Sequence, residues 1–190
     1  MSATTDLLEE LQMRGALQSG HFRLSSGRHS DRFVQKFRIL EDPKVLAPLA
    51  SAIAEHFQSD DPSVVISAAV GGILLGYEVA RALATKAIFV EKQEGRPVLR
   101  RDFVLDAKDR VLIVEDVMTT GQSVREVMQL VRDRSAEIVG VGAIVQRAPV
   151  ELGVATFALL SLPLESYEAE HCPQCRAGIP LRDPGSRRSA

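Results

Sequence analysis

Two adjacent acids followed by a hydroxyl-rich turn are the residues of this sequence best suited to chemistry. Glu115 and Asp116 come directly after the apolar run 111–114, and the segment 119–123 offers hydroxyls, backbone N–H groups and a glycine. Ligands of parallel sheets bind beyond the carboxyl ends of the strands, and the N-terminus of a helix binds phosphate. This combination suits a phosphorylated sugar.

A buried strand and an amphipathic helix must position these groups. The run 111–114 is apolar and mostly β-branched, which is typical of a central strand in a parallel sheet. After the turn, apolar residues at helical spacing predict a helix over 122–134, namely Val124, Val127, Met128 and Val131. The N-terminus of that helix would lie at the turn.

The rest of the chain predicts an α/β fold. A helix ends before Gly15, extended stretches surround Phe22 and Phe33, and a second helix opens at Pro43. From residue 64, apolar runs alternate with amphipathic stretches, as in a parallel sheet with crossover helices. We expect strands over 64–66, 87–90, 111–114, 138–145 and 156–162, and helices over 73–84 and 122–134. The polar stretch 91–110 interrupts this alternation, and connections of that length are usually functional or mobile.

Composition narrows the class of protein. A chain of 190 residues that is 45% hydrophobic suits one well-packed domain. Its 23 basic and 25 acidic side chains leave a net charge of -2, so no broad basic surface favours nucleic acid or a membrane. The first ten residues are polar and acidic, and no run is long enough to span a bilayer. With two cysteines, we expect a cytoplasmic protein without a disulfide scaffold.

The segment 111–123 resembles the phosphoribosyl-diphosphate (PRPP) motif of type I phosphoribosyltransferases. The segment 20–33, Gly-His-Phe-Arg-Leu-Ser-Ser-Gly-Arg-His-Ser-Asp-Arg-Phe, resembles the N-terminal signature of orotate phosphoribosyltransferases. The resemblance implies a central, mostly parallel sheet flanked by helices, with a small hood built largely from the N-terminal segment. It implies one domain over 1–190, with a hood mainly at 15–40, a core at about 43–162 and an irregular tail at 163–190.

The resemblance also implies an activity in pyrimidine (UMP) biosynthesis. Orotate phosphoribosyltransferases transfer the 5-phosphoribosyl group from PRPP to orotate, giving orotidine 5′-monophosphate and pyrophosphate. By analogy, Glu115 and Asp116 bind the ribose hydroxyls and favour the positive charge that develops on the sugar. The implied PRPP site continues through Val117, Met118, Thr119, Thr120, Gly121, Gln122 and Ser123, the last five around the 5′-phosphate. Mg²⁺ would be held mainly by PRPP and water, with no direct protein ligand.

Pyrophosphate would be bound by a glycine loop and a mobile catalytic loop. The resemblance assigns backbone contacts to Gly71 and Gly72, and it assigns catalysis to Lys92, with Arg96 as a further PRPP contact. Arg100 and Arg101 are additional candidate clamps. In related enzymes the loop corresponding to 91–101 reaches into the neighbouring subunit, which implies a homodimer.

This sequence departs from the family pattern at several charged positions. Val70 and Gly71 stand where the family often has an aromatic residue and a lysine, and Glu91 stands where relatives often have arginine. Ser25 occupies a position where some relatives have a PRPP-binding lysine, for which Lys36 or Arg28 could substitute.

Three residues are implied at the orotate site. Arg147 follows the predicted strand 138–145 and matches the arginine that binds orotate in the family. Thr119 matches a threonine that contacts the same ligand, and Phe33 is a candidate apolar wall for the planar ring. Orotate has a carboxylate on a planar ring, so its site needs a cation for the carboxylate, a small hydrogen-bond donor and an apolar wall for the ring.

The sequence leaves two questions of function open. The alternatives are a type I phosphoribosyltransferase for another nucleobase and a regulator that binds PRPP without catalysis. In addition, Cys172 and Cys175 form a CxxC pair preceded by His171, which offers at most three ligands where a structural zinc site takes four. A second subunit could complete such a site, but the pattern favours ordinary thiols in an irregular tail.

Overall fold

The computed structural model describes residues 3–24 and 26–184, and the chain divides into two compact units. The hood unit comprises Met1–Arg38 and Pro163–Ala190, and the core unit comprises Ile39–Leu162. These bounds lie close to the predicted hood and core. The segment after residue 162, however, belongs to the hood unit instead of forming a separate tail. That the two units make one domain stays a prediction.

A six-stranded sheet with the strand order β5-β4-β3-β6-β7-β8 forms the centre of the core unit. All neighbouring strands are parallel except β4 and β5, which are antiparallel. The predicted mostly parallel sheet is therefore confirmed. The strands are β3 (Val64–Ala68), β4 (Lys86–Gln93), β5 (Arg96–Leu99), β6 (Arg110–Met118), β7 (Glu137–Gln146) and β8 (Thr156–Ser161).

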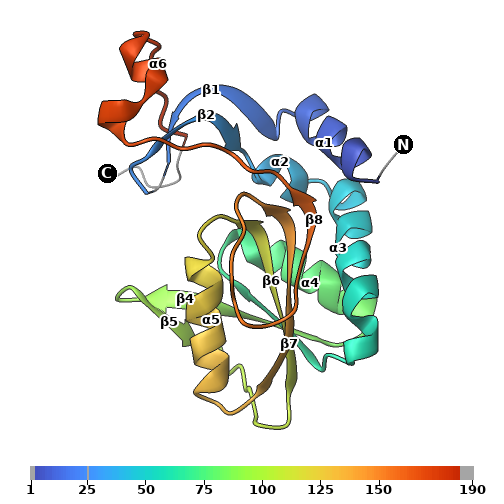
Figure 1. Cartoon of the computed structure of the whole chain (residues 1–190). Coiled ribbons are helices and arrows are strands. Elements are labelled where there is room, and N and C mark those ends of the chain that lie inside the picture. The colour runs from blue at the N-terminus through green and yellow to red at the C-terminus, as the bar shows by residue number, and fades with distance from the viewer. Residues whose placement is uncertain (1–2, 25, 185–190) are drawn as a thin grey trace. The chain divides into compact units, whose positions relative to one another are not determined.

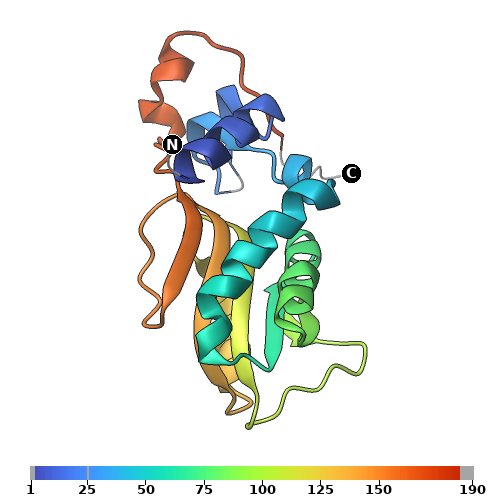
Figure 2. The same ribbon diagram turned by 90° about the vertical axis from the view of Figure 1, so that its right-hand side faces the viewer.

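Helices cover both faces of this sheet. Figures 1 and 2 show α3 (Pro43–Phe57) and α4 (Gly71–Leu83) on one face and α5 (Gln122–Arg132) on the other. Two short helices, α2 (Phe37–Leu40) and η1 (Gln58–Asp60), precede and follow α3. Among the described residues, no helix is long and apolar enough to cross a lipid bilayer.

The core is built from the central strands and the helix faces against them. β3 is almost fully apolar and buried, and β6 is apolar and buried over 111–114, as expected for strands covered by helices on both sides. On β7, a Cβ added at Gly142 would lie 2.5 Å from Ile53 Cγ2 of α3. Only a glycine lets α3 pack this closely on the sheet, because any side chain there would collide with it.

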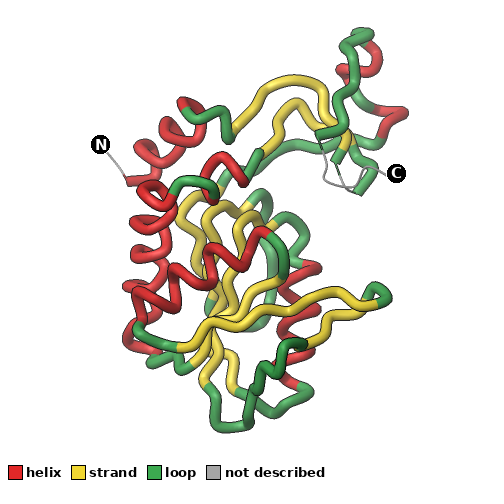
Figure 3. The backbone as a smooth tube through the Cα atoms, turned by 180° about the vertical axis from the view of Figure 1, so that it is seen from behind, coloured by secondary structure: helices red, strands yellow, loops and turns green. Residues whose placement is uncertain are grey.

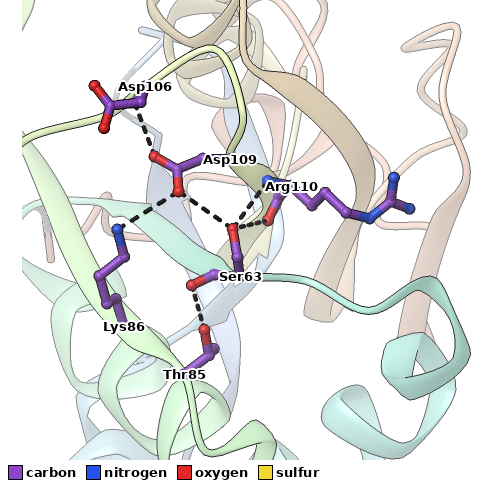
Figure 4. A network of polar contacts seen from close by, with 6 residues as sticks. All are labelled: Ser63, Thr85, Lys86, Asp106, Asp109 and Arg110. Carbon is purple, nitrogen blue, oxygen red and sulfur yellow. Dashed lines mark hydrogen bonds and ion pairs between the residues drawn. The ribbon is translucent and has the colours of Figure 1, made fainter.

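A polar network around Asp109 fixes the amino ends of the central strands (Figure 4). The Asp109 carboxylate accepts hydrogen bonds from the Asp106 backbone N–H at 2.8 Å and the Ser63 hydroxyl at 3.3 Å, and Lys86 Nζ lies 3.5 Å away. Burial by itself raises the pKa of Asp109. The Asp106 N–H, the Lys86 ammonium and the Ser63 hydroxyl outweigh burial, and the pKa is lowered. The network joins the chain segments that enter β3, β4 and β6.

The hood unit contains an antiparallel strand pair and the C-terminal segment. Helix α1 (Ala3–Met13) precedes β1 (Leu17–Arg23), which pairs with β2 (His29–Val34) through a register shift between Ser19 and Phe22. In its described part, the C-terminal segment contains two short helices, η2 (Ala169–His171) and α6 (Pro173–Arg176). Figure 1 shows α6 next to the β1–β2 pair.

Candidate active site

The two acids lie inside β6, not after it. The predicted strand ended at Val114, but β6 continues to Met118 because its pairing with β7 extends from Glu115↔Ala143 to Met118↔Gln146. On the other side, pairing with β3 stops at Ser67↔Val114. Beyond Val114, β6 therefore has a neighbouring strand on one side only. The edge of β6 that faced β3 is unpaired there, so a ligand can approach the carboxyl end of β6 from that side.

The acids differ in their surroundings. Asp116 is 2% exposed, and its Oδ1 accepts a hydrogen bond from the Val117 backbone N–H at 2.7 Å. Glu115 is half-buried, and its Oε1 accepts from the Asp116 backbone N–H at 3.2 Å. Both carboxylates are thus held by the backbone of β6. They form a fixed negative site at the end of the strand.

The turn after β6 has the features of a phosphate-binding loop. Thr119, Thr120 and Ser123 are exposed, and Gly121 has a φ of +74°, in the left-handed region that favours glycine. Helix α5 begins at Gln122 without a side-chain cap. The backbone N–H groups of its first turn, with the positive end of the helix dipole, form an anion site.

Arg125 is a residue of this loop that the sequence interpretation missed. Its guanidinium donates to the Thr120 carbonyl at 2.6 Å and to the Glu151 carbonyl at 3.0 Å. It therefore ties the turn to the segment after β7. The sequence contains no signal for this contact beyond the position of Arg125 one helical turn after Gly121.

The glycine loop lies at the next strand end. Gly71 and Gly72 are buried and form the first turn of α4, directly after β3. A Cβ at Gly72 would lie 3.1 Å from Ser67 Cβ and 3.9 Å from the Val114 carbonyl oxygen. The loop is thus adjacent to the point where β6 loses its pairing with β3. Val70, which precedes this first turn, is 73% exposed.

The stretch predicted as a mobile loop contains a β-hairpin. β4 continues to Gln93, a two-residue turn follows at Glu94 and Gly95, and β5 returns along β4 (Figure 3). The turn residues have φ values of 51° and 78°, as the tight turn of such a hairpin requires. An acid–glycine pair between two extended stretches was the available signal. Pro97 is tolerated because β5 is an edge strand.

The hairpin brings Lys92 to the helix that follows the phosphate loop. Lys92 Nζ lies 2.8 Å from Glu126 Oε2 of α5, and Gln122 also donates to Glu126. Arg96 is exposed on β5. The other two loop arginines are paired with Glu91, at 3.9 Å for Arg100 and 3.0 Å for Arg101. Lys92 is thus joined to the candidate PRPP site through Glu126, which also accepts a hydrogen bond from Gln122.

Arg147 lies beside the end of β6. Its backbone N–H donates to the Met118 carbonyl at 2.9 Å, which sets it next to Thr119. Its Nε is buried and has no hydrogen-bond partner among the described residues, and burial lowers the pKa of its guanidinium. A desolvated guanidinium is costly unless an anion accompanies it. This position therefore favours a ligand with negative charge.

The candidate residues of the hood unit are placed within that unit only. Phe33 is half-buried in β2, with its ring centroid 5.7 Å from that of Phe22. Ser25 lies outside the described residues. Arg28 forms an ion pair with Glu168 and donates to the Ser166 hydroxyl at 2.9 Å, so its guanidinium is engaged by the C-terminal segment. The roles of Phe33, Arg28 and Lys36 toward a ligand stay predictions.

The core unit thus gathers the two acids, the uncapped first turn of α5 and several cations at one edge of the sheet. β3, β6 and β7 are parallel neighbours, so the loops after their carboxyl ends meet there. The segment 37–152 matches the family model described as phosphoribosyl transferase domain. That segment contains the acids, the turn, the hairpin and Arg147.

Relatives that match nearly the full chain specify the family further. An orotate phosphoribosyltransferase of Pelotomaculum thermopropionicum is 47% identical over 185 residues, covering 96% of this chain and 97% of the relative. The chain belongs to the orotate phosphoribosyltransferase family. A second member, from Chlorobaculum parvum, is 43% identical and covers 98% of this chain and 97% of its own.

Solved structures agree with this assignment. The crystal structure of orotate phosphoribosyltransferase from Aeropyrum pernix superposes with a TM-score of 0.70 at 27% identity. It covers 82% of this chain and 93% of its own. The family expected from the motif and the N-terminal signature is therefore confirmed, and so is the fold.

Proposed function

We propose that this protein transfers the 5-phosphoribosyl group of PRPP to orotate, giving orotidine 5′-monophosphate and pyrophosphate. The observation that carries the proposal is Arg147, a guanidinium with a buried, unpartnered Nε beside Thr119 at the end of the PRPP motif. In the reaction a ring nitrogen of orotate loses its proton to solvent and bonds to C1 of the ribose, while the bond from C1 to the pyrophosphate oxygen breaks and pyrophosphate leaves. Three charged parts of the substrates must each be bound by protein groups of opposite charge or by hydrogen-bond donors. They are the phosphates, the sugar that becomes cationic, and the orotate carboxylate.

The turn at 119–123 supplies the site for the 5′-phosphate. The hydroxyl-bearing residues Thr119, Thr120 and Ser123 are exposed, and the N-cap residue of α5, Gly121, has no side chain to cap the helix. Arg125 fixes the turn through the Thr120 carbonyl, so the amides are already oriented before a ligand binds. A preorganised loop loses little conformational entropy on binding.

Glu115 and Asp116 are proposed to bind the ribose hydroxyls. Their carboxylates are fixed by backbone hydrogen bonds at 3.2 Å and 2.7 Å. Negative charge held at this position stabilises the positive charge that develops on the sugar as pyrophosphate leaves. Neither carboxylate needs to act as a nucleophile.

The hairpin and the glycine loop are proposed to bind pyrophosphate. The backbone N–H groups at Gly71 and Gly72 open the α4 helix, whose positive end favours an anion. Lys92, paired with Glu126, and the exposed Arg96 are the hairpin cations that could exchange protein contacts for phosphate oxygens. Movement of the hairpin over the site would exclude water and protect the sugar cation.

Mg²⁺ is proposed as the cofactor. Carboxylate oxygens and phosphate oxygens are its preferred ligands, and Glu115 and Asp116 can orient its bound water molecules. When bound, the ion would neutralise charge on the leaving pyrophosphate. The glycine loop lacks the lysine that the family often carries, which makes this neutralisation more important here.

Orotate is proposed to bind to Arg147 and Thr119 of the core unit. A guanidinium binds a carboxylate through two parallel hydrogen bonds, which a purine without a carboxylate could not use. Thr119 adds a hydroxyl next to Arg147. Phe33 is the proposed apolar wall for the planar ring.

A homodimer in the cytoplasm is the proposed assembly and location. Leu74 and Tyr77 of helix α4 are exposed, as is Val70 just before the helix, and the three recur at helical spacing and form an apolar face. Two-fold dimers are the commonest oligomers, and such a face suits one. The free thiols of Cys172 and Cys175 suit a reducing compartment.

The test is a steady-state assay of the purified protein with PRPP and Mg²⁺ across a panel of bases. We expect pyrophosphate release with orotate and none above background with adenine, hypoxanthine, guanine or uracil. Turnover of a purine or of uracil without turnover of orotate would refute the assignment of the base. Binding of PRPP in a calorimeter without pyrophosphate release from any base would indicate a regulator instead.

A further inference from the structure

Four metal-binding side chains of the hood unit meet at one point. His21 lies on β1, His29 begins β2, and Cys172 and Cys175 belong to the C-terminal segment. One ligand atom of each residue lies within 4.8 Å of every other. The sequence interpretation counted His171 as the third ligand, but His171 is exposed and outside this group.

Hydrogen bonding alone does not explain the short distances among these four side chains. His21 Nδ1 lies 2.8 Å from the Ile179 carbonyl oxygen, which can only accept, so Nδ1 carries the proton. In the neutral ring, Nε2 is then an unprotonated nitrogen with one lone pair. Three atoms surround it, namely His29 Nδ1 at 3.0 Å, Cys172 Sγ at 3.4 Å and Cys175 Sγ at 3.6 Å. The single lone pair of His21 Nε2 cannot accept hydrogen bonds from three donors at once. Four ligand atoms that coordinate one cation, however, lie at such distances from one another.

The distances match a tetrahedral zinc site. With Zn–N of about 2.05 Å and Zn–S of about 2.3 Å, tetrahedral geometry sets ligand atoms about 3.3 Å (N to N) and 3.6 Å (N to S) apart. The observed separations are 3.0 Å between the nitrogens and 3.2–3.6 Å between nitrogen and sulfur. Four of the six separations thus agree with a tetrahedral site to within a few tenths of an ångström, and the other two, which involve Cys172 Sγ, are at most 4.8 Å.

Charge and burial also fit a closed structural site. His21, His29 and Cys172 are buried, and Cys175 lies at the rim. Two thiolates with two neutral imidazoles balance the double positive charge of zinc, so the buried site has no net charge. The bond from His21 to the Ile179 carbonyl is the kind of outer contact that orients a metal-bound histidine.

Backbone hydrogen bonds hold the two parts of the site in register. His29 and Tyr167 exchange two bonds of 2.8 Å, and the Arg182 N–H donates to the His21 carbonyl at 2.8 Å. Gln174, between the cysteines, donates to the Gly20 carbonyl at 2.8 Å. The C-terminal segment is thus fixed on both sides of the CxxC pair.

We propose that His21, His29, Cys172 and Cys175 bind one zinc ion that fastens the C-terminal segment to the β1–β2 pair. The donors surround a single point, because His21 Nε2 lies within 3.6 Å of both sulfurs. This excludes a two-iron cluster, in which the histidines and cysteines bind different irons. The ion links residues up to 154 positions apart in the sequence. It is separate from the proposed Mg²⁺ and does not depend on the proposed reaction.

The first measurement is the metal content of tag-free protein purified without chelator, by inductively coupled plasma mass spectrometry. We expect about one zinc per chain, as for a structural site. Replacement by Co²⁺ should give the strong visible absorption of a tetrahedral ion together with thiolate charge-transfer bands. Protein that holds no zinc and binds no Co²⁺ after dialysis against either ion would overturn the proposal, as would a Cys172–Cys175 disulfide or bound iron and sulfide.

Variants test the ligand set. Cys175→Ser and His29→Ala should lose zinc, whereas Cys175→His, which restores a nitrogen ligand, should retain it. The matched control is His171→Ala, next to Cys172 but outside the cluster, which should keep full zinc content. Should Cys175→Ser fail to fold, the cobalt spectrum of the unaltered protein still decides the question. Zinc that persists in folded Cys175→Ser and His29→Ala would overturn the ligand set.

Discussion

Gly121 offers the sharpest test of how the phosphate loop is built. It precedes α5 with a φ of +74°, and a Cβ added there would lie 2.5 Å from Val150 Cγ1. Ordinary contact begins at 3.4 Å, so Gly121→Ala forces the turn or Val150 to move by about 0.9 Å. The substitution therefore perturbs the loop without changing charge or polarity.

The expected cost has two parts. A left-handed conformation costs an alanine about 1–2 kcal/mol, and overpacking adds about 1–3 kcal/mol. Gly153→Ala isolates the first part, because Gly153 has a φ of +71° and nothing lies within 4 Å of an added Cβ. The loss of unfolded-state entropy is the same in both variants and cancels. The free energy of unfolding should thus fall by about 1–3 kcal/mol more for Gly121→Ala than for Gly153→Ala.

The assays are urea unfolding and steady-state kinetics. Gly121→Ala should lower kcat/KM for PRPP by up to about 100-fold, because a shift near 1 Å misplaces the phosphate-binding amides. Gly153→Ala should leave kcat/KM unchanged. In a double-mutant cycle, Val150→Ala should relieve part of the Gly121→Ala defect by removing the colliding carbon.

Two results would refute this reasoning. Equal destabilisation of the Gly121→Ala and Gly153→Ala variants would mean that the loop accommodates the added Cβ without a steric collision with Val150. Normal kinetics with PRPP in Gly121→Ala, despite the expected loss of stability, would mean that this turn does not bind the phosphate.

Four further predictions concern charge. Asp116→Asn should lower kcat by about 100- to 1,000-fold in steady-state assays while the far-ultraviolet circular dichroism stays unchanged, since one group that stabilises developing charge is lost. Arg147→Lys should raise KM for orotate by about 10-fold or more and leave KM for PRPP unchanged, because lysine keeps the charge but loses the two-pronged hydrogen bond. Lys92→Ala should lower kcat/KM for PRPP by about 10- to 100-fold, the loss of one charged hydrogen bond to phosphate. Asp109→Asn should lower the free energy of unfolding at neutral pH by about 1–3 kcal/mol in urea titrations. Because the folded-state pKa of Asp109 is lowered from 3.8, this stabilisation exists above that pH and should vanish as the pH falls below it.

Matched controls accompany these variants. Asp102→Asn and Lys108→Ala change exposed residues outside the site and should leave the kinetics intact. A fully active Asp116→Asn enzyme, or an Arg147→Lys enzyme whose KM rises equally for both substrates, would contradict the assigned roles. If the free energy of unfolding of the wild-type protein and of Asp109→Asn depended on pH in the same way, the network would not hold Asp109 ionised.

Local pattern allowed much of the core unit to be predicted from the sequence. Apart from β5, which the polar stretch 91–110 concealed, the order of strands and helices from Val64 to Ser161 follows from apolar runs and helical spacing, because each such segment needs only its own residues to show its period. The motif around Glu115 and Asp116 was recognisable for the same reason. Strand ends were less predictable: the polar acids masked the continuation of β6, which depends on pairing with β7.

Tertiary structure decided the contacts between residues distant in the chain. The sequence determined the family, the acids, the glycine turn and Arg147 as the cation after β7. Only the folded chain joins Lys92 to Glu126, ties Arg125 to Glu151 and unites His21 with a cysteine 154 positions away. Such pairs cannot be predicted from the periodicity of the sequence, because strand register and the path of the whole chain decide which distant residues lie close together.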